Sequence, residues 1–69
     1  MKTYVWYDSL SNSIWVSSLN PDEDIEYDKL DIESFKVPVP QGYIYGAIAN
    51  PIVNVLSKCG AEVIYLGAM

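Results

Sequence analysis

Two short stretches near the start of the chain decide the fold: residues 3–8 read TYVWYD, and residues 13–18 read SIWVSS. Both consist largely of β-branched and aromatic residues, which favour strands. The linking residues 8–12, DSLSN, are mostly turn formers whose side chains hydrogen-bond the nearby backbone. The sequence therefore predicts an N-terminal β-hairpin, closed after its second strand by Asn20 and Pro21.

Side chains alternate between the two faces of a strand, so this hairpin is apolar on both faces. One face holds Val5 and Tyr7, with Ile14 and Val16 expected opposite them. The other face holds three aromatic residues: Tyr4, Trp6 and Trp15.

The later elements are read from residue types and spacing. Residues 34–39, SFKVPV, predict a short extended piece that Pro38 and a following proline restrict to a sheet edge. A helix is expected to begin near Asn50 and Pro51, a favoured N-cap followed by a favoured first helical residue. Its apolar stripe is Ile52, Val55, Leu56 and Cys59, so Cys59 is expected to be a small core residue.

Two segments complete the predicted architecture. The apolar residues 43–49 fit either a strand or an extension of the helix, and residues 62–66, EVIYL, predict a final strand. The expected fold is a single α+β domain over residues 1–69. It has a small antiparallel sheet of three or four strands, with one helix packed on one face.

Composition excludes several functional classes. The chain has 69 residues, nine acids, four lysines, no arginine, no histidine and one cysteine. Without imidazole there is no Ser–His–Asp or Cys–His mechanism, and a lone cysteine cannot build a Cys/His zinc site. Four scattered lysines offer no basic stripe for direct nucleic-acid binding. We expect a cytoplasmic protein that is not an enzyme, binds no metal or cofactor, and does not enter a membrane, because there is no signal peptide or long apolar run.

The aromatic face admits two interpretations. One helix covers only one face of a small sheet, so Tyr4, Trp6 and Trp15 either pack beneath the acidic connection or form an interface with a partner. Trp and Tyr are enriched at the residues that dominate binding energy. As an interface, this face would bind a larger protein or a second copy of the chain.

Residues 22–33, DEDIEYDKLDIE, hold seven acids and one lysine, a local charge of −6. The segment is expected to be a loop, a short helical turn around residues 27–30, or an edge strand. It is not a calcium loop, because Tyr27 stands where such a loop needs glycine. It is either a solvated charge run or a mimic of nucleic-acid phosphates that meets a basic groove on a larger protein. The residues assigned to such contact are Asp22, Asp24, Glu26, Tyr27 and Asp28.

The stretch YVWYD at 4–8, with Asn12, Ile14 and Val16 after it and IYLG at 64–67, resembles small uncharacterised proteins encoded by bacteriophages. The resemblance implies a host-cell context in which very small acidic proteins bind and block a larger host protein. The chain departs from it in ending Ala68-Met69, where such proteins often place an acid. The expected function is a non-enzymatic inhibitor or modulator. The alternatives are a self-associating structural or virion subunit and a small-molecule sponge at an oligomer interface.

Overall fold

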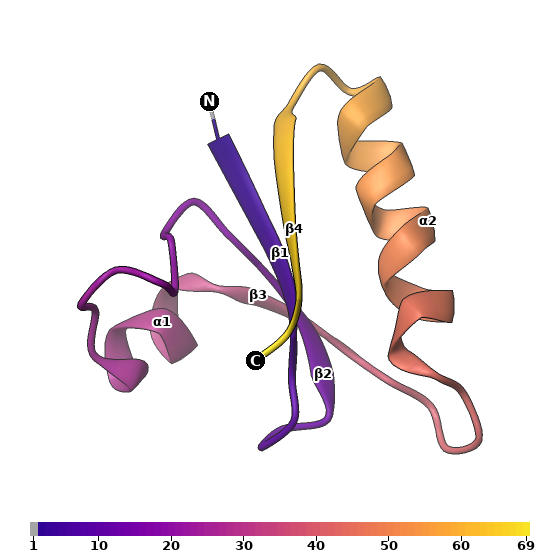
Figure 1. Ribbon diagram of the computed structural model, residues 1–69, viewed down its shortest axis with the longest axis horizontal. Coiled ribbons are helices and arrows are strands. Elements are labelled where there is room, and N and C mark those ends of the chain that lie inside the picture. Colours follow the sequence, from indigo (N-terminus) through magenta and orange to yellow (C-terminus); the bar gives the residue numbers. More distant parts are fainter. Residues whose placement is uncertain (1) are drawn as a thin grey trace.

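The computed structural model describes residues 2–69 and contains one four-stranded sheet and two helices. The strand order across the sheet is β3-β2-β1-β4. Helix α2 lies on one side of the sheet, and α1 with its preceding loop lies on the other (Figure 1). The elements are β1 Lys2–Asp8, β2 Ser13–Ser17, α1 Tyr27–Glu33, β3 Phe35–Pro38, α2 Tyr45–Lys58 and β4 Glu62–Ala68.

The predicted hairpin is confirmed, with β1 and β2 antiparallel. Trp6 pairs with Trp15, Val5 with Val16, and Tyr7 with Ile14. Directly paired residues lie on the same face of a sheet, so the two tryptophans share one face, and the pairs Val5–Val16 and Tyr7–Ile14 share the other. Alternation in the sequence was sufficient to predict this division.

The sheet is mixed, whereas the sequence predicted an antiparallel one. Strand β3 pairs antiparallel with β2 at one edge, as expected of an edge strand, but β4 pairs parallel with β1 at the other edge. The reason is the connection between the two edges. Helix α2 carries the chain across the sheet from β3 to β4, and such a crossover through a helix joins parallel strands.

Helix α2 begins at Tyr45, six residues before the proline that was expected to start it. Residues 43–49 therefore contribute mainly to the helix rather than to a strand. The apolar face that continues through Tyr45, Ile48 and Ala49 packs on the sheet and outweighs the loss of one helical hydrogen bond at Pro51. The core on this side is formed around the buried Val5, Ile14, Val39 and Ala49.

Cys59 was predicted to lie in the core, and this was wrong. The helix ends at Lys58, and Cys59 is the exposed C-terminal cap residue. The helical stripe that predicted its burial does not extend beyond the last turn, where the chain bends through Gly60 at a φ of 92°.

The second face of the sheet is also covered, so one helix is not the only cover. Trp6, Trp15 and Leu30 form a buried cluster, joined by the partly buried Leu19 and Ile25 and by Tyr4 and Leu66 of the sheet. Leu19, Ile25 and Leu30 belong to the connection between β2 and β3, which packs over the tryptophans. This connection forms α1 on the side of the sheet away from α2 (Figure 1). The acidic connection is therefore a structural layer of the molecule.

Candidate binding surfaces

The aromatic residues assigned to a partner interface lie inside the protein. Trp6 is 3% exposed and Trp15 1% exposed, while Tyr4 is half-buried against them. The two indole rings lie 5.8 Å apart between centroids. This is the arrangement of the alternative interpretation, in which the aromatic face packs beneath the acidic connection. Neither indole is accessible to a partner in this fold.

The acidic residues assigned to partner contact are on the surface. Within the segment, Ile25 and Leu30 pack inward against the tryptophans, whereas Ile32 is 82% exposed. The carboxylates extend outward on the same side of the molecule as α1. The exposed carboxylates include all four of those assigned from the sequence: Asp22, Asp24, Glu26 and Asp28.

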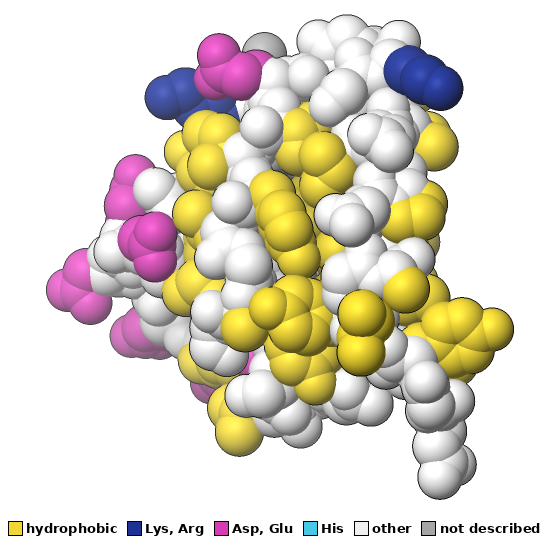
Figure 2. Space-filling model, turned by 45° about the vertical axis from the view of Figure 1, so that its right-hand side comes forward, with side chains coloured by type: hydrophobic (Ala, Val, Ile, Leu, Met, Phe, Trp, Pro, Cys, Tyr) yellow, Lys and Arg dark blue, Asp and Glu magenta, His cyan; other side chains and the backbone are white. Residues whose placement is uncertain are grey.

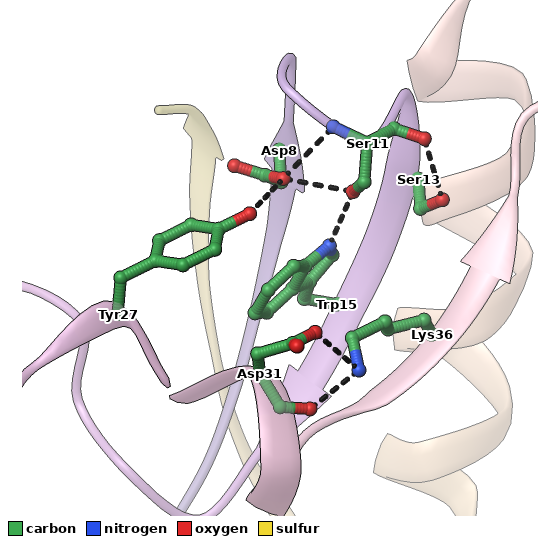
Figure 3. A network of polar contacts seen from close by, with 7 residues as sticks. All are labelled: Asp8, Ser11, Ser13, Trp15, Tyr27, Asp31 and Lys36. Atoms are coloured by element: carbon green, nitrogen blue, oxygen red, sulfur yellow. Dashed lines mark hydrogen bonds and ion pairs between the residues drawn. The ribbon is translucent and has the colours of Figure 1, made fainter. Parts of the chain in front are cut away.

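A polar network ties this acidic layer to the hairpin turn (Figure 3). The buried Asp8 carboxylate accepts hydrogen bonds from the Ser11 backbone N–H at 3.1 Å and from the Ser11 hydroxyl at 2.8 Å. It also accepts one from the Tyr27 hydroxyl at 3.2 Å. The Ser11 hydroxyl in turn accepts a hydrogen bond from Trp15 Nε1 at 2.9 Å. Tyr27 is nineteen residues from Asp8 along the chain, so no local sequence pattern indicates this hydrogen bond.

The environment of Tyr27 favours its neutral phenol. Its ring packs against Trp15, with centroids 5.5 Å apart, and about half of the residue is exposed. Desolvation by burial raises the pKa of Tyr27 above its usual value of 10.0, and the hydrogen bond to Asp8 raises it further. The negative charges of Asp8 and Asp31 act in the same direction. Tyr27 therefore anchors the acidic layer while its hydroxyl is protonated.

A second anchor lies at the other end of α1. Lys36 Nζ on β3 forms an ion pair with Asp31 Oδ1 at 2.8 Å and donates to the Asp31 carbonyl. The same ammonium lies 5.0 Å from the centre of the Trp15 ring, within range of a cation–π interaction. Tyr27 and Lys36 thus fix both ends of α1 over Trp15 (Figure 3). This network is a structural support for the acidic surface.

An apolar groove of about 470 Å³ opens on the opposite side of the sheet, between α2 and the strands β2 and β3. It arises because a helix is about 10 Å wide, whereas a four-stranded sheet spans roughly 15–19 Å. Helix α2 contacts β1, β4 and β2, which leaves space above β3. At the margins of the groove Phe35 is 71% exposed and Val55 59% exposed. The lining is entirely apolar: Val16, Phe35, Val37, Pro51, Ile52, Val55 and Leu56.

Charge is segregated between the two sides of the molecule. Residues 37–57, which include most of α2, contain no charged side chain, and seven of the nine acids lie in residues 22–33. In Figure 2, hydrophobic side chains gather in the middle of the face that carries α2, and acidic side chains lie along its left margin and at its top. The uncharged run was visible in the sequence. The sequence did not show that this run borders a groove, because the other wall of the groove is formed by β2 and β3.

No group of three or more His, Cys, Asp or Glu side chains within residues 2–69 is placed to hold a metal ion. In the same range, no helix has the length and apolar character needed to cross a membrane. Comparisons of the chain with protein-family models, with curated proteins and with solved structures find no match.

Proposed function

We propose that this protein is a non-enzymatic binding module that modulates a larger protein by holding an amphipathic, basic helix of that protein in the groove beside α2. The observation that carries the proposal is the groove itself: about 470 Å³, lined only by apolar side chains, with Phe35 and Val55 exposed at its margins. Large aromatic side chains at the margin of an apolar groove are suited to act as anchors for a bound helix.

The charge of the chain supports a basic occupant. The protein carries a net charge of −5, and the acidic segment runs directly into β3, the strand that forms one wall of the groove. Glu33 lies two residues before Phe35 and is exposed. A helix with apolar residues on one side and lysine or arginine on the other would fill the groove and also be attracted by these carboxylates. The acidic segment then contributes attraction and orientation, while the groove contributes the apolar contact.

A designed peptide tests this proposal directly. The probe is a fifteen-residue helix with leucine at positions i, i+3, i+4 and i+7 and lysine elsewhere, about 22 Å long and so similar in length to α2. Binding is measured by calorimetry, and its site by NMR shifts of the methyl groups of Val16, Val37 and Val55. We expect the shifts to concentrate on these groove methyls, as the apolar face of the peptide enters the groove.

The matched variants are Phe35→Ser, inside the groove, and Ile44→Ser, an equally exposed apolar residue outside its lining. Neither changes the charge of the protein. Phe35→Ser is expected to weaken peptide binding at least about tenfold, because the apolar anchor is lost, whereas Ile44→Ser leaves it unchanged. Equal effects of the two variants, or methyl shifts confined to residues outside the groove, would overturn the proposal.

A further inference from the structure

The two edges of the sheet differ in how they are protected against pairing with another strand. Strand β3 is four residues long, carries Lys36, ends at Pro38 and is followed closely by a second proline. Lysine, proline and short length are the usual means by which an edge strand avoids further pairing. Strand β4, at the opposite edge, has seven residues and contains no lysine or proline, and its one irregularity is a register shift against β1 between Tyr65 and Ala68. Its sequence, EVIYLGA, has its only charge at the first residue.

From this contrast we infer that β4 pairs antiparallel with β4 of a second copy of the chain, joining two sheets of four strands into one of eight. The inference concerns the β4 edge, which is separate from the groove and its proposed occupant. Among residues 2–69, β4 has a strand neighbour, β1, on one side only. Its Val, Ile, Tyr and Leu residues have strong strand propensity, so its free backbone groups form a ready template for a further strand.

For a second copy as the occupant, charge favours the antiparallel orientation. A two-fold axis places the Glu62 side chains at opposite ends of the paired strands. Even if only residues 62–66 pair, four steps of about 3.3 Å separate these carboxylates by about 13 Å, which exceeds the screening length of about 8 Å in physiological salt. Residues 22–33 form α1 and its loop on the face of the sheet opposite α2, and they do not approach the axis. Two copies that each carry −5 can therefore meet without opposing their acids.

The position of α2 is compatible with the strand pairing. A two-fold axis perpendicular to the joined sheet puts both α2 helices on the same face. Because α2 contacts β2 as well as β1 and β4, it lies over β1, so the two helices would stand about three strand spacings, or roughly 14 Å, apart across the junction without packing directly against each other. Successive residues of a helix are 100° apart, so one flank of α2 lies opposite the residues that line the groove. The side chains on this flank are short and uncharged, so they do not hinder the two copies from meeting. The flank consists of Gly46, Asn50, Val53 and Ser57.

The contact area places the dimer among weak, reversible ones. Strand β4 and helix α2 are each about 20 Å long, and together they offer a strip about 15 Å wide. Such a strip buries about 300 Å² per copy, or about 600 Å² in total, which is less than the roughly 1,200–2,000 Å² of stable specific interfaces. We therefore expect a dimer, twice the 7.7 kDa of the chain, that forms between about 1 µM and 1 mM protein.

Sedimentation equilibrium over this concentration range tests the inference with Tyr65→Lys and Phe35→Lys as a matched pair. Tyr65 lies on β4 and is 38% exposed, while Phe35 lies on the other edge strand, and both substitutions replace an exposed aromatic residue by lysine. Tyr65→Lys is expected to weaken dimerisation at least about tenfold, because Tyr65 lies at the axis or one residue from it, so that the ammonium groups of the two copies repel each other across the paired strands. Phe35→Lys should leave dimerisation unchanged, although it occupies the groove proposed to bind a helix.

Hydrogen exchange on the wild-type chain provides a readout that does not depend on how well a variant folds. Amides of residues 62–66 should exchange more slowly as protein concentration rises, whereas those of residues 35–38 should not change. A monomer throughout the concentration range would overturn the inference. So would a dimer lost in Phe35→Lys but retained in Tyr65→Lys, since it would form through the groove. Protection of β4 that appears only with a different protein would equally exclude the second copy as its occupant.

Discussion

Replacing Trp6 with alanine separates a core role for the aromatic face from an interface role. The side chain is 3% exposed and packs against Trp15 and Leu30. A buried tryptophan removes about 200 Å² from water, and at roughly 25 cal/mol per Å² this corresponds to about 5 kcal/mol. Measured Trp→Ala substitutions in cores cost about 3–5 kcal/mol, so we expect a loss of about 4 kcal/mol for Trp6→Ala.

That loss is large compared with the stability available to a chain of this size. At about 0.05–0.15 kcal/mol per residue, 69 residues give a free energy of unfolding of roughly 3–10 kcal/mol. Trp6→Ala is therefore expected to be largely unfolded or close to unfolding in water. Trp6→Phe, which retains an aromatic ring, should remain folded with a smaller loss of about 1–3 kcal/mol.

Urea denaturation followed by far-ultraviolet circular dichroism measures these differences, with Phe35→Ala as the control. Phe35 is a large aromatic residue that is 71% exposed, so its removal should change stability by less than about 0.5 kcal/mol. The samples must be dilute enough to remain monomeric, because association would add apparent stability. If Trp6→Ala and Phe35→Ala unfold at the same urea concentration, the core assignment of Trp6 is wrong and the interface interpretation returns.

Three further perturbations test the acidic layer and the helix. The phenol pKa of Tyr27 is higher in the folded chain than in the unfolded chain, so the neutral phenol stabilises the fold below the unfolded-state pKa, and this stabilisation is lost as the pH rises through the folded-state pKa. The Tyr27→Phe variant has no phenol to ionise and should therefore lose less stability than the wild type as the pH rises through about 10. Urea midpoints at about pH 9 and 11 compare the two chains, and identical pH profiles would contradict the expectation. Pro51→Ala should raise the free energy of unfolding by about 1–3 kcal/mol, because a proline inside the helix removes a hydrogen bond; an unchanged urea midpoint would show that the ring's groove contacts compensate. A fourfold variant replaces Asp22, Asp24, Glu26 and Asp28 together by Asn or Gln. It should associate more slowly with the leucine–lysine peptide at low salt, while its stability stays equal or rises slightly. Unchanged association rates in stopped-flow measurements would refute this expectation.

The hairpin could be predicted because its information is local. Alternation of side chains along residues 4–7 and 14–16 determines which residues share a face, and the short turn brings the strands into register. The start of α2 could not be predicted in the same way. Asn50 and Pro51 have the local properties of a helix start, but the helix continues ahead of them because Tyr45 and Ile48 pack on the sheet. Tertiary packing outweighed a local signal.

The candidate surfaces depend even more on contacts between distant residues. The groove needs Phe35 and Val37 of β3 beside Ile52 and Val55 of α2, and no periodicity in either segment indicates this neighbour. The parallel pairing of β4 with β1 likewise depends on the crossover through α2. The sequence indicated an uncharged run and an acidic run. Their placement on opposite sides of a sheet follows only from the fold.

In the acidic connection between β2 and β3, the residues that pack inward differ from those that carry its charge. Leu19, Ile25 and Leu30 cover the tryptophans, while the neighbouring carboxylates are directed to solvent. A charge of −6 in twelve residues is unfavourable in isolation, and the anchors at Tyr27 and Lys36 hold it in place over Trp15. Changes to the carboxylates should therefore alter association with basic partners, whereas changes to the apolar residues should alter stability. Such a division allows the charged surface to change while the fold is retained.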